Sequence, residues 1–434
     1  MGAIDNLLDP IPIPRMVRVV QSFERPVIRD LESEFEKQLD AKNVASLIRK
    51  GQRIAITAGS RGIHDLPRVL GMLVRVVKQR GGEPFLVPAM GSHGGATAEG
   101  QAAMLRSMGI HEEAVGAPVR ATMETVKIGE SDKGIPVYMD RYAHEADGVI
   151  IVNQIKPHVS FRGPYESGLM KMMVIGLGKQ KGAAICHDLG FGRMAENISD
   201  LGRRVLEKGK VLFGLAMLEN AHHETCRLEI LKGNEIEKRE PALLEEARAL
   251  SPKIFLDRLD VLIIEEMGKD ISGTGFDTNT VGRYHSPYAS GGPVITRIAV
   301  LDLTDRSHGN ANGLGIADFT TRRLFDKLDF EQTYPNSLTT TVPLSVKIPM
   351  VLKNDRQAIR AAIKTCNRWH KNRVRMVKIR NTNELNRIEA SESLLEEIRE
   401  HGSLKTDAIP YGLTFDEEGN LQKSPISSRV IVHR

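Results

Sequence analysis

A lysine and a histidine in one apolar stretch are the residues whose types could most directly hold a reactive group. Lys171 lies among methionines and a valine, and His187 follows sixteen residues later, beside Asp188. Apolar surroundings lower the pKa of an amine and make it nucleophilic, although a lysine there can also extend its ammonium to solvent. A histidine next to a carboxylate can bind a metal or can be a half-buried structural residue. The pattern therefore permits covalent and metal chemistry and leaves the structural interpretations open.

Two further histidines and one arginine lie in loops that follow predicted strands. His93 stands in GSHGGA, where small neighbours leave the imidazole usable, and His158 stands in NQIKPHVSFRG. Imidazole exchanges protons near neutral pH, so both are candidate acid–base groups, although either can be an ordinary turn residue. The loop GSRG offers the Ser60 hydroxyl and the Arg61 guanidinium, which suit a carboxylate or a phosphate. An ordinary turn with a surface arginine fits that loop equally well.

The elements that must position these loops alternate between strand and helix. Short apolar runs predict strands at 53–58, 84–90 and 148–153, and apolar periodicity predicts helices at 66–77 and 97–108, the second capped by Thr97. Ligand sites of such sheets lie at the carboxyl ends of the strands, where these loops stand. The alternation continues downstream, with predicted helices at 241–250, 317–328 and 353–365 and a strand that begins near Leu259.

The length of 434 residues exceeds what one hydrophobic core usually organises. We therefore predict an α/β fold of two lobes, each a mixed or parallel sheet flanked by helices, with the active site in the cleft between them. The lobe boundary is expected near residue 255.

In this order, the four loop and helix motifs resemble one family. SR in the first loop, GSH in the second, KPH after the third strand, and Lys171 and His187 separated by MMVIGLGKQKGAAIC are similar to the nickel-pincer-dependent lactate racemases and related 2-hydroxyacid racemases and epimerases. The resemblance is clearest over about the first 200 residues, and the lysine-to-histidine spacing is its most specific part. It implies an isomerase, with lactate as only one candidate substrate.

The resemblance also implies the cofactor and its residues. Lys171 would carry a pyridinium thioamide/thiocarboxylate mononucleotide, the nickel-pincer nucleotide, and His187 would complete a square-planar nickel, with Ser60 at the cofactor. Planar coordination with a nitrogen donor suits Ni(II). Residues 1–255 would form the cofactor-binding lobe, and residues 256–434 would complete the substrate site. Proteins of cofactor biosynthesis are then expected partners.

The same resemblance assigns the substrate groups. His93 and His158 would be paired proton acceptors and donors on opposite sides of the substrate, and Arg61 would hold its carboxylate together with Lys269 of the second lobe. Hydride leaves the 2-hydroxy acid while a base takes the hydroxyl proton, which gives a planar keto acid. Return of the hydride to the other face gives the opposite stereoisomer, so each stereoisomer uses a different base.

Composition narrows the partners and the compartment. The formal charge is only +5, from 60 basic and 55 acidic residues. One acid-free stretch, 364–380, is basic, but Trp369 is its only aromatic residue, so we predict a solvated face or a subunit contact, possible in a homo-oligomer, and no nucleic-acid binding. Three scattered cysteines and the lack of a signal peptide or a long apolar run predict a cytoplasmic protein without a membrane partner.

Two other functions remain as alternatives. The strand and helix pattern would suit a nicotinamide-dependent dehydrogenase, but no GxGxxG follows the first strand. A catalytically silent sugar-acid or nucleotide-binding protein could share the fold. That alternative gives no reason for His93, His158, Lys171 and His187 to be present together.

Overall fold

The computed structural model describes residues 2–60 and 62–422, and these form two compact units. One, here called the central unit, is Glu24–Ser251, and the other, the terminal unit, combines Met1–Phe23 with Pro252–Arg434. The chain passes from one unit to the other close to residue 255. An earlier passage follows Phe23, because β1 (Met16–Gln21) pairs antiparallel with β14 (Arg387–Ser391) and β15 (Leu404–Thr406) and so belongs to the terminal unit.

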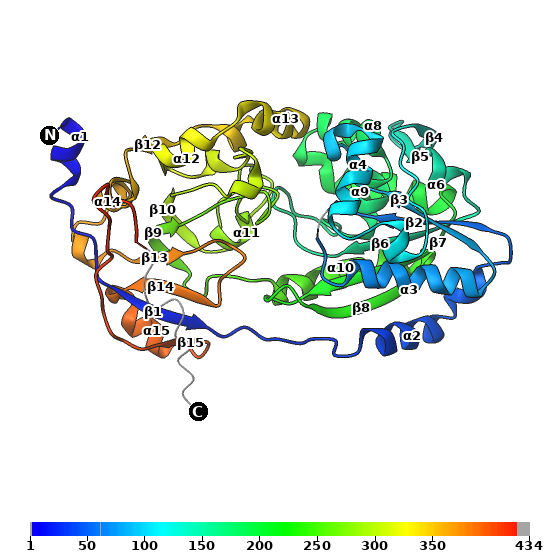
Figure 1. The fold of residues 1–434 in the computed structure, drawn as a ribbon, viewed down its shortest axis with the longest axis horizontal. Coiled ribbons are helices and arrows are strands. Elements are labelled where there is room, and N and C mark those ends of the chain that lie inside the picture. The colour runs from blue at the N-terminus through cyan, green and yellow to red at the C-terminus, as the bar shows by residue number, and fades with distance from the viewer. Residues whose placement is uncertain (1, 61, 423–434) are drawn as a thin grey trace. The chain divides into compact units, whose positions relative to one another are not determined.

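The central unit is built on a five-stranded mixed sheet with helices on both faces (Figure 1). The order is β3-β2-β6-β7-β8, parallel except for the edge strand β8. Its strands are β2 (Arg53–Ala58), β3 (Glu83–Pro88), β6 (Gly148–Gln154), β7 (Val211–Glu219) and β8 (Thr225–Lys232), and a separate hairpin pairs β4 (Thr125–Glu130) with β5 (Pro136–Asp140). The predicted α/β alternation is thus confirmed in this unit.

Apolar side chains of alternating sheet positions pack against different helices. Phe213 and Leu215 of β7 share a core with α3, whereas Gly214 between them leaves room for Leu169 and Ile236 on the opposite face. The helices of the unit are α2 (Leu31–Lys42), α3 (Leu66–Gln79), α4 (Ala98–Ser107), α5 (Glu112–Val115), α6 (Arg141–Glu145), α7 (Leu169–Lys171), α8 (Lys179–Asp188), α9 (Met194–Lys208) and α10 (Gly233–Leu250). The predicted cap of α4 is present, since the Thr97 hydroxyl accepts the Gly100 N–H.

Helix α10 begins eight residues before the predicted start at Pro241. A proline in a helix lacks the N–H that would bond the carbonyl four residues earlier. Here the Tyr165 hydroxyl donates to that carbonyl, of Glu237, at 2.8 Å. A side chain from a distant loop therefore lets the helix continue through Pro241.

The terminal unit has an eight-stranded mixed sheet, in the order β12-β11-β10-β9-β13-β14-β1-β15. Val261 and Ile263 of the central strand face one apolar core, and Leu262 and Ile264 face another. The central strand is β9 (Arg258–Ile264). The other elements of the unit are β10 (Val294–Val300), β11 (Phe319–Thr321), β12 (Met350–Leu352), β13 (Met376–Ile379), α1 (Ala3–Leu8), α11 (Thr278–Val281), α12 (Arg322–Lys327), α13 (Phe330–Thr340), α14 (Asp355–Thr365) and α15 (Leu395–Glu400).

The helix predicted over 317–328 is only half correct. Phe319–Thr321 is strand β11, which hydrogen-bonds between β10 and β12, and only Arg322–Lys327 is helical. The Thr321 hydroxyl accepts the Leu324 N–H and so caps α12 at the point where the strand ends. Pairing with two neighbouring strands overrides the helical periodicity of the sequence here.

Carboxylates from elsewhere in the terminal unit neutralise much of the basic stretch 364–380. Arg368 pairs with Asp260 at 2.6 Å, Arg375 pairs with Glu397 at 2.6 Å, and Lys378 lies between two glutamates. Part of the run of cations in the sequence is therefore engaged in ion pairs in the fold. Along the described part of the chain, no helix combines the length and the apolar character needed to cross a membrane.

Candidate active site

The loop after β2 and the loop after β3 contact each other through two predicted site residues. The Ser60 hydroxyl and Nδ1 of His93 lie 2.5 Å apart, in a hydrogen bond that either group can donate. Both strands end at the same edge of the sheet because they are parallel. Arg61 lies outside the described residues, so its predicted contact with a carboxylate stays a prediction.

Close packing explains the glycines around His93. Gly91 and Gly94 have positive φ angles of 59° and 65°. A Cβ at Gly94 would come within 2.7 Å of the backbone N of Gln101, and one at Gly91 would lie 3.3 Å from the Ile175 carbonyl oxygen. The His93 loop therefore lies directly against α4 and against the segment that follows Lys171.

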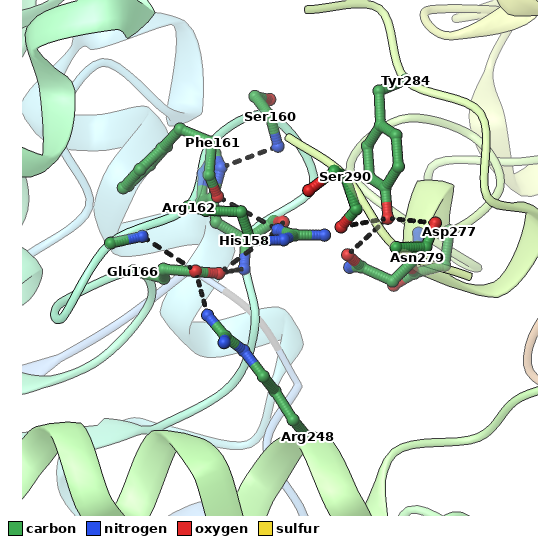
Figure 2. A network of polar contacts seen from close by, with 12 residues as sticks. His158, Ser160, Phe161, Arg162, Glu166, Arg248, Asp277, Asn279, Tyr284 and Ser290 are labelled. Atoms are coloured by element: carbon green, nitrogen blue, oxygen red, sulfur yellow. Dashed lines mark hydrogen bonds and ion pairs between the residues drawn. The ribbon is translucent and has the colours of Figure 1, made fainter. Parts of the chain in front are cut away.

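The His158 loop is organised around a buried carboxylate (Figure 2). Lys156 and Ser167 pair across the base of the loop, and the fully buried Glu166 accepts the backbone N–H of His158 at 2.7 Å and that of Gly163 at 3.1 Å. Arg248 of α10 forms an ion pair with the same carboxylate.

A second arginine completes this arrangement. Arg162 lies 3.4 Å from Glu166 and donates to the His158 carbonyl oxygen at 2.6 Å. The buried charge is thus compensated by guanidinium and backbone donors, and the loop that carries His158 is held in one conformation.

Aromatic contacts connect the His158 ring to the His187 ring. The Ser160 N–H donates to Nδ1 of His158 at 3.1 Å, and this ring packs on Phe161 with centroids 4.5 Å apart. Phe191 lies 6.1 Å from the His158 ring and meets the His187 ring edge-on at 5.5 Å. The two predicted functional histidines therefore border one apolar cluster.

Lys171 ends a short helical turn whose start is anchored by two polar side chains. Asn153, near the end of β6, donates to the Gly168 carbonyl oxygen at 2.8 Å, and the Glu240 carboxylate accepts the Met170 N–H at 2.9 Å. Met172–Gly176 continues as a π-helix, a rare form often found at functional sites. Both anchors therefore fix the backbone that directly precedes Lys171.

Burial of Glu240 yields a prediction about stability. Desolvation raises the pKa of this fully buried carboxyl to about 8. A raised folded-state pKa means that unfolding releases a proton between about pH 4.5 and about pH 8, so stability falls as the pH rises through this range, by at most about 1.4 kcal/mol per pH unit. Glu240→Gln should lose this component. Urea unfolding across this range should then give stability curves for wild type and variant that diverge with pH, and parallel curves would contradict the assignment.

His187 lies in the last turn of α8, and it is a neutral imidazole at pH 7. Burial, and to a smaller extent the charge of Lys171, lowers the pKa of His187 to about 4. Sixteen residues of straight helix would span about 24 Å, too far for such an effect in salt solution. The helix is broken at Lys179, whose φ is 54°, so the two ends of the segment can approach.

The terminal unit contains the remaining predicted site residue, Lys269, in the loop after β9. Its backbone N–H donates to the Ser307 hydroxyl at 2.9 Å, and its ammonium donates to the Gly273 carbonyl oxygen at 2.6 Å. The side chain is half-buried. A role for Lys269 in binding a substrate carboxylate stays a prediction.

Sequence reasoning proposed the histidines and Lys171 but missed the ionisable side chains that hold their segments, namely the buried Glu166 and Glu240 and the half-buried Arg248. Glu166, Arg248 and Glu240 are separated from their partners by up to 82 residues. An acidic side chain is rarely buried unless it has a partner, so burial would have marked these residues as structurally important. Their burial was not evident from their local sequences.

These features define an α/β protein with histidine-bearing loops gathered around one lysine-containing helical segment. Residues 9–198 match the lactate racemase N-terminal domain. This N-terminal part of the chain is therefore similar to the lactate racemases, which supports the predicted resemblance. Among solved structures, it is similar to the lactate racemase apoprotein from Thermoanaerobacterium thermosaccharolyticum, with a TM-score of 0.46 and 12% identity over 81% of this chain and 86% of that chain. No curated protein matches.

Proposed function

We propose that the chain is a racemase or epimerase of a small 2-hydroxy acid that uses proton-coupled hydride transfer with a nickel-pincer nucleotide. The match of residues 9–198 to the lactate racemase N-terminal domain supports an isomerase-type role in general. The observation that carries the finer proposal is that Lys171 and His187 stand on one segment, bent at Lys179, which contacts the His93 loop through Gly91 and the His158 ring through Phe191. An amine beside a neutral imidazole suits a covalently attached nucleotide whose metal takes one ligand from the protein.

The chemistry of these residues fits the cofactor. The depressed pKa of His187 leaves its imidazole neutral, so a nitrogen lone pair is available to Ni(II). Within residues 2–60 and 62–422, no three His, Cys, Asp or Glu side chains gather into a metal-binding group. The other donors would therefore belong to the nucleotide. When bound, the cofactor supplies a reversible acceptor for hydride from the substrate carbon.

The protein's own groups would handle protons and charge. His93 and His158 each take the hydroxyl proton of one stereoisomer and return a proton to the keto acid formed from the other. The hydrogen bond with Ser60 would orient the His93 ring. A contact of Ser60 with the cofactor is a further proposal, as is binding of the substrate carboxylate by Arg61 and Lys269.

Intact-mass spectrometry and metal analysis test the proposal directly. Protein made in a host that synthesises the pincer nucleotide should contain nickel and interconvert the stereoisomers of a 2-hydroxy acid. If the cofactor is covalent, wild type should also show a mass adduct that Lys171→Ala lacks. Lys238→Ala is a matched control, because Lys238 is an exposed lysine of α10.

The outcomes separate the parts of the proposal. An adduct that persists in Lys171→Ala would place the attachment elsewhere. Nickel without an adduct would make the cofactor noncovalent and leave the reaction intact. Wild type without nickel in such a host would contradict the proposed function. Cofactor-biosynthesis proteins are partners that this function requires, whereas a cytoplasmic location and a homo-oligomer stay predictions.

A further inference from the structure

A buried lysine occupies the bend between Lys171 and His187. Lys179 is fully buried, although lysine is among the residues least often found inside proteins. Its φ of 54° is in the left-handed region, which residues other than Gly, Asn and Asp rarely adopt. Such a conformation persists only where the surrounding structure holds it. Glycine would fit this backbone better, so the side chain itself requires an explanation.

The ammonium of Lys179 has two hydrogen-bond acceptors and one ion-pair partner. It pairs with Asp140 at 3.0 Å, donates to Oε1 of Gln101 at 3.0 Å and also donates to the Pro88 carbonyl oxygen at the end of β3. Asp140 is itself fixed, because it accepts the Ala143 N–H at 3.0 Å and its own N–H donates to the Leu177 carbonyl oxygen at 2.7 Å. The bend is therefore tied to three separate elements.

Gln101 extends this network to the His93 loop. Its Nε2 donates to the carbonyl oxygen of Gly91 at 2.8 Å and to that of His93 at 3.2 Å, while its Oε1 faces Lys179. The amide orientation is unambiguous, since the ammonium can only donate and the two carbonyls can only accept. One buried side chain thus joins the histidine loop to the bend.

A buried ion pair is a weak source of stability because desolvation offsets most of its attraction, whereas it can specify one conformation. We infer that Lys179 and Gln101 are positioning residues that hold the His93 loop in a fixed place against the bend between Lys171 and His187. Their part in catalysis rests on the proposed function. The mechanical link between the two segments does not.

Hydrogen exchange measured by mass spectrometry on the full chain without cofactor tests the link. Gln101→Met removes the two donors to the loop and the acceptor for Lys179. We expect faster exchange both in residues 91–97 and in residues 176–188. Gln21→Met is the matched control, because Gln21 is equally buried and donates to the carbonyls of Lys253 and Leu385 in the terminal unit. It should leave both segments unchanged.

Kinetics on cofactor-loaded enzyme then test the catalytic role. We expect Gln101→Met to lower kcat about tenfold or more with KM little changed, since misplacement of a reacting group mainly affects the chemical step. Gln21→Met should retain kcat. If Gln101→Met does not fold, Gln101→Glu takes its place, because it keeps an acceptor for Lys179 and loses both donors to the loop.

The inference is overturned if exchange is unchanged, if only residues 91–97 exchange faster, or if Gln21→Met produces the same changes. An equal loss of kcat in both variants would reduce the network to ordinary stabilisation and likewise overturn it. A loaded wild type that is inactive would count against the proposed function alone, because the exchange result still decides whether the two segments are linked.

Discussion

Replacing His187 with alanine is expected to abolish nickel retention and to reduce racemisation or epimerisation to the uncatalysed background. His187 is the one protein ligand that we propose for nickel, so its removal would leave the metal without that attachment to the protein. Cys186 precedes His187, but burial raises the pKa of that thiol to about 12 and keeps it protonated. Metal analysis of the purified variant, together with turnover, is the measurement.

A matched histidine makes this result specific. His144 lies in the last turn of α6 in the same unit, as His187 lies in the last turn of α8. His144→Ala should therefore retain nickel and activity. Equal nickel in wild type and His187→Ala would remove His187 from the metal site, whatever happened to turnover. A loss of nickel in both variants would point to general destabilisation.

Local sequence was sufficient for elements whose pattern and packing agree. The strands β2, β3 and β6 were predicted within two residues at each end, because their short apolar runs are also buried. The cap at Thr97 was predicted because its partner, Gly100, lies three residues away. Such interactions are local, so they leave a signal in the sequence.

The predictions of secondary structure that failed concern residues whose conformation is decided by a contact with a distant part of the chain. Pro241 was predicted to start a helix, but the helix begins earlier. The Tyr165 hydroxyl bonds the Glu237 carbonyl oxygen that Pro241 leaves without a backbone partner, and this contact spans seventy-two residues, so the local sequence gave no sign of it. Strand β11 was interpreted as helix because its two neighbouring strands decide its conformation.

The same reasoning applies to the candidate site. Lys171 and His187 were found by spacing within one segment, whereas the bend that brings them together depends on Lys179 and on its contacts with Gln101 and Asp140. The assignment of Ser60 to the cofactor stays a prediction, and its hydrogen bond with His93, thirty-three residues away, was not evident from the sequence. Residue type and order therefore predicted candidate functional groups, and tertiary contacts determine what holds them.

Removal of either His93 or His158 should stop net interconversion in both directions, and the two variants should differ in the stereoisomer that they still oxidise. If the two rings face opposite sides of a planar keto acid, each is the base for one stereoisomer and the conjugate acid for the other. A variant that keeps the correct base can still oxidise one stereoisomer once. General acid–base catalysis contributes about 10²- to 10⁴-fold, so the loss of steady-state turnover should be of that order.

Single-turnover mixing of loaded enzyme with each stereoisomer measures this difference as a change in cofactor absorbance. His93→Ala and His158→Ala should respond to opposite stereoisomers. The supports of the two rings differ, Ser60 for His93 and the Glu166 loop for His158, so either substitution should leave the other ring in place. The same preference in both variants would contradict the two-base assignment and return one histidine to a structural role. Full activity in either variant would be more damaging, since it would mean that the missing imidazole takes no part in proton transfer.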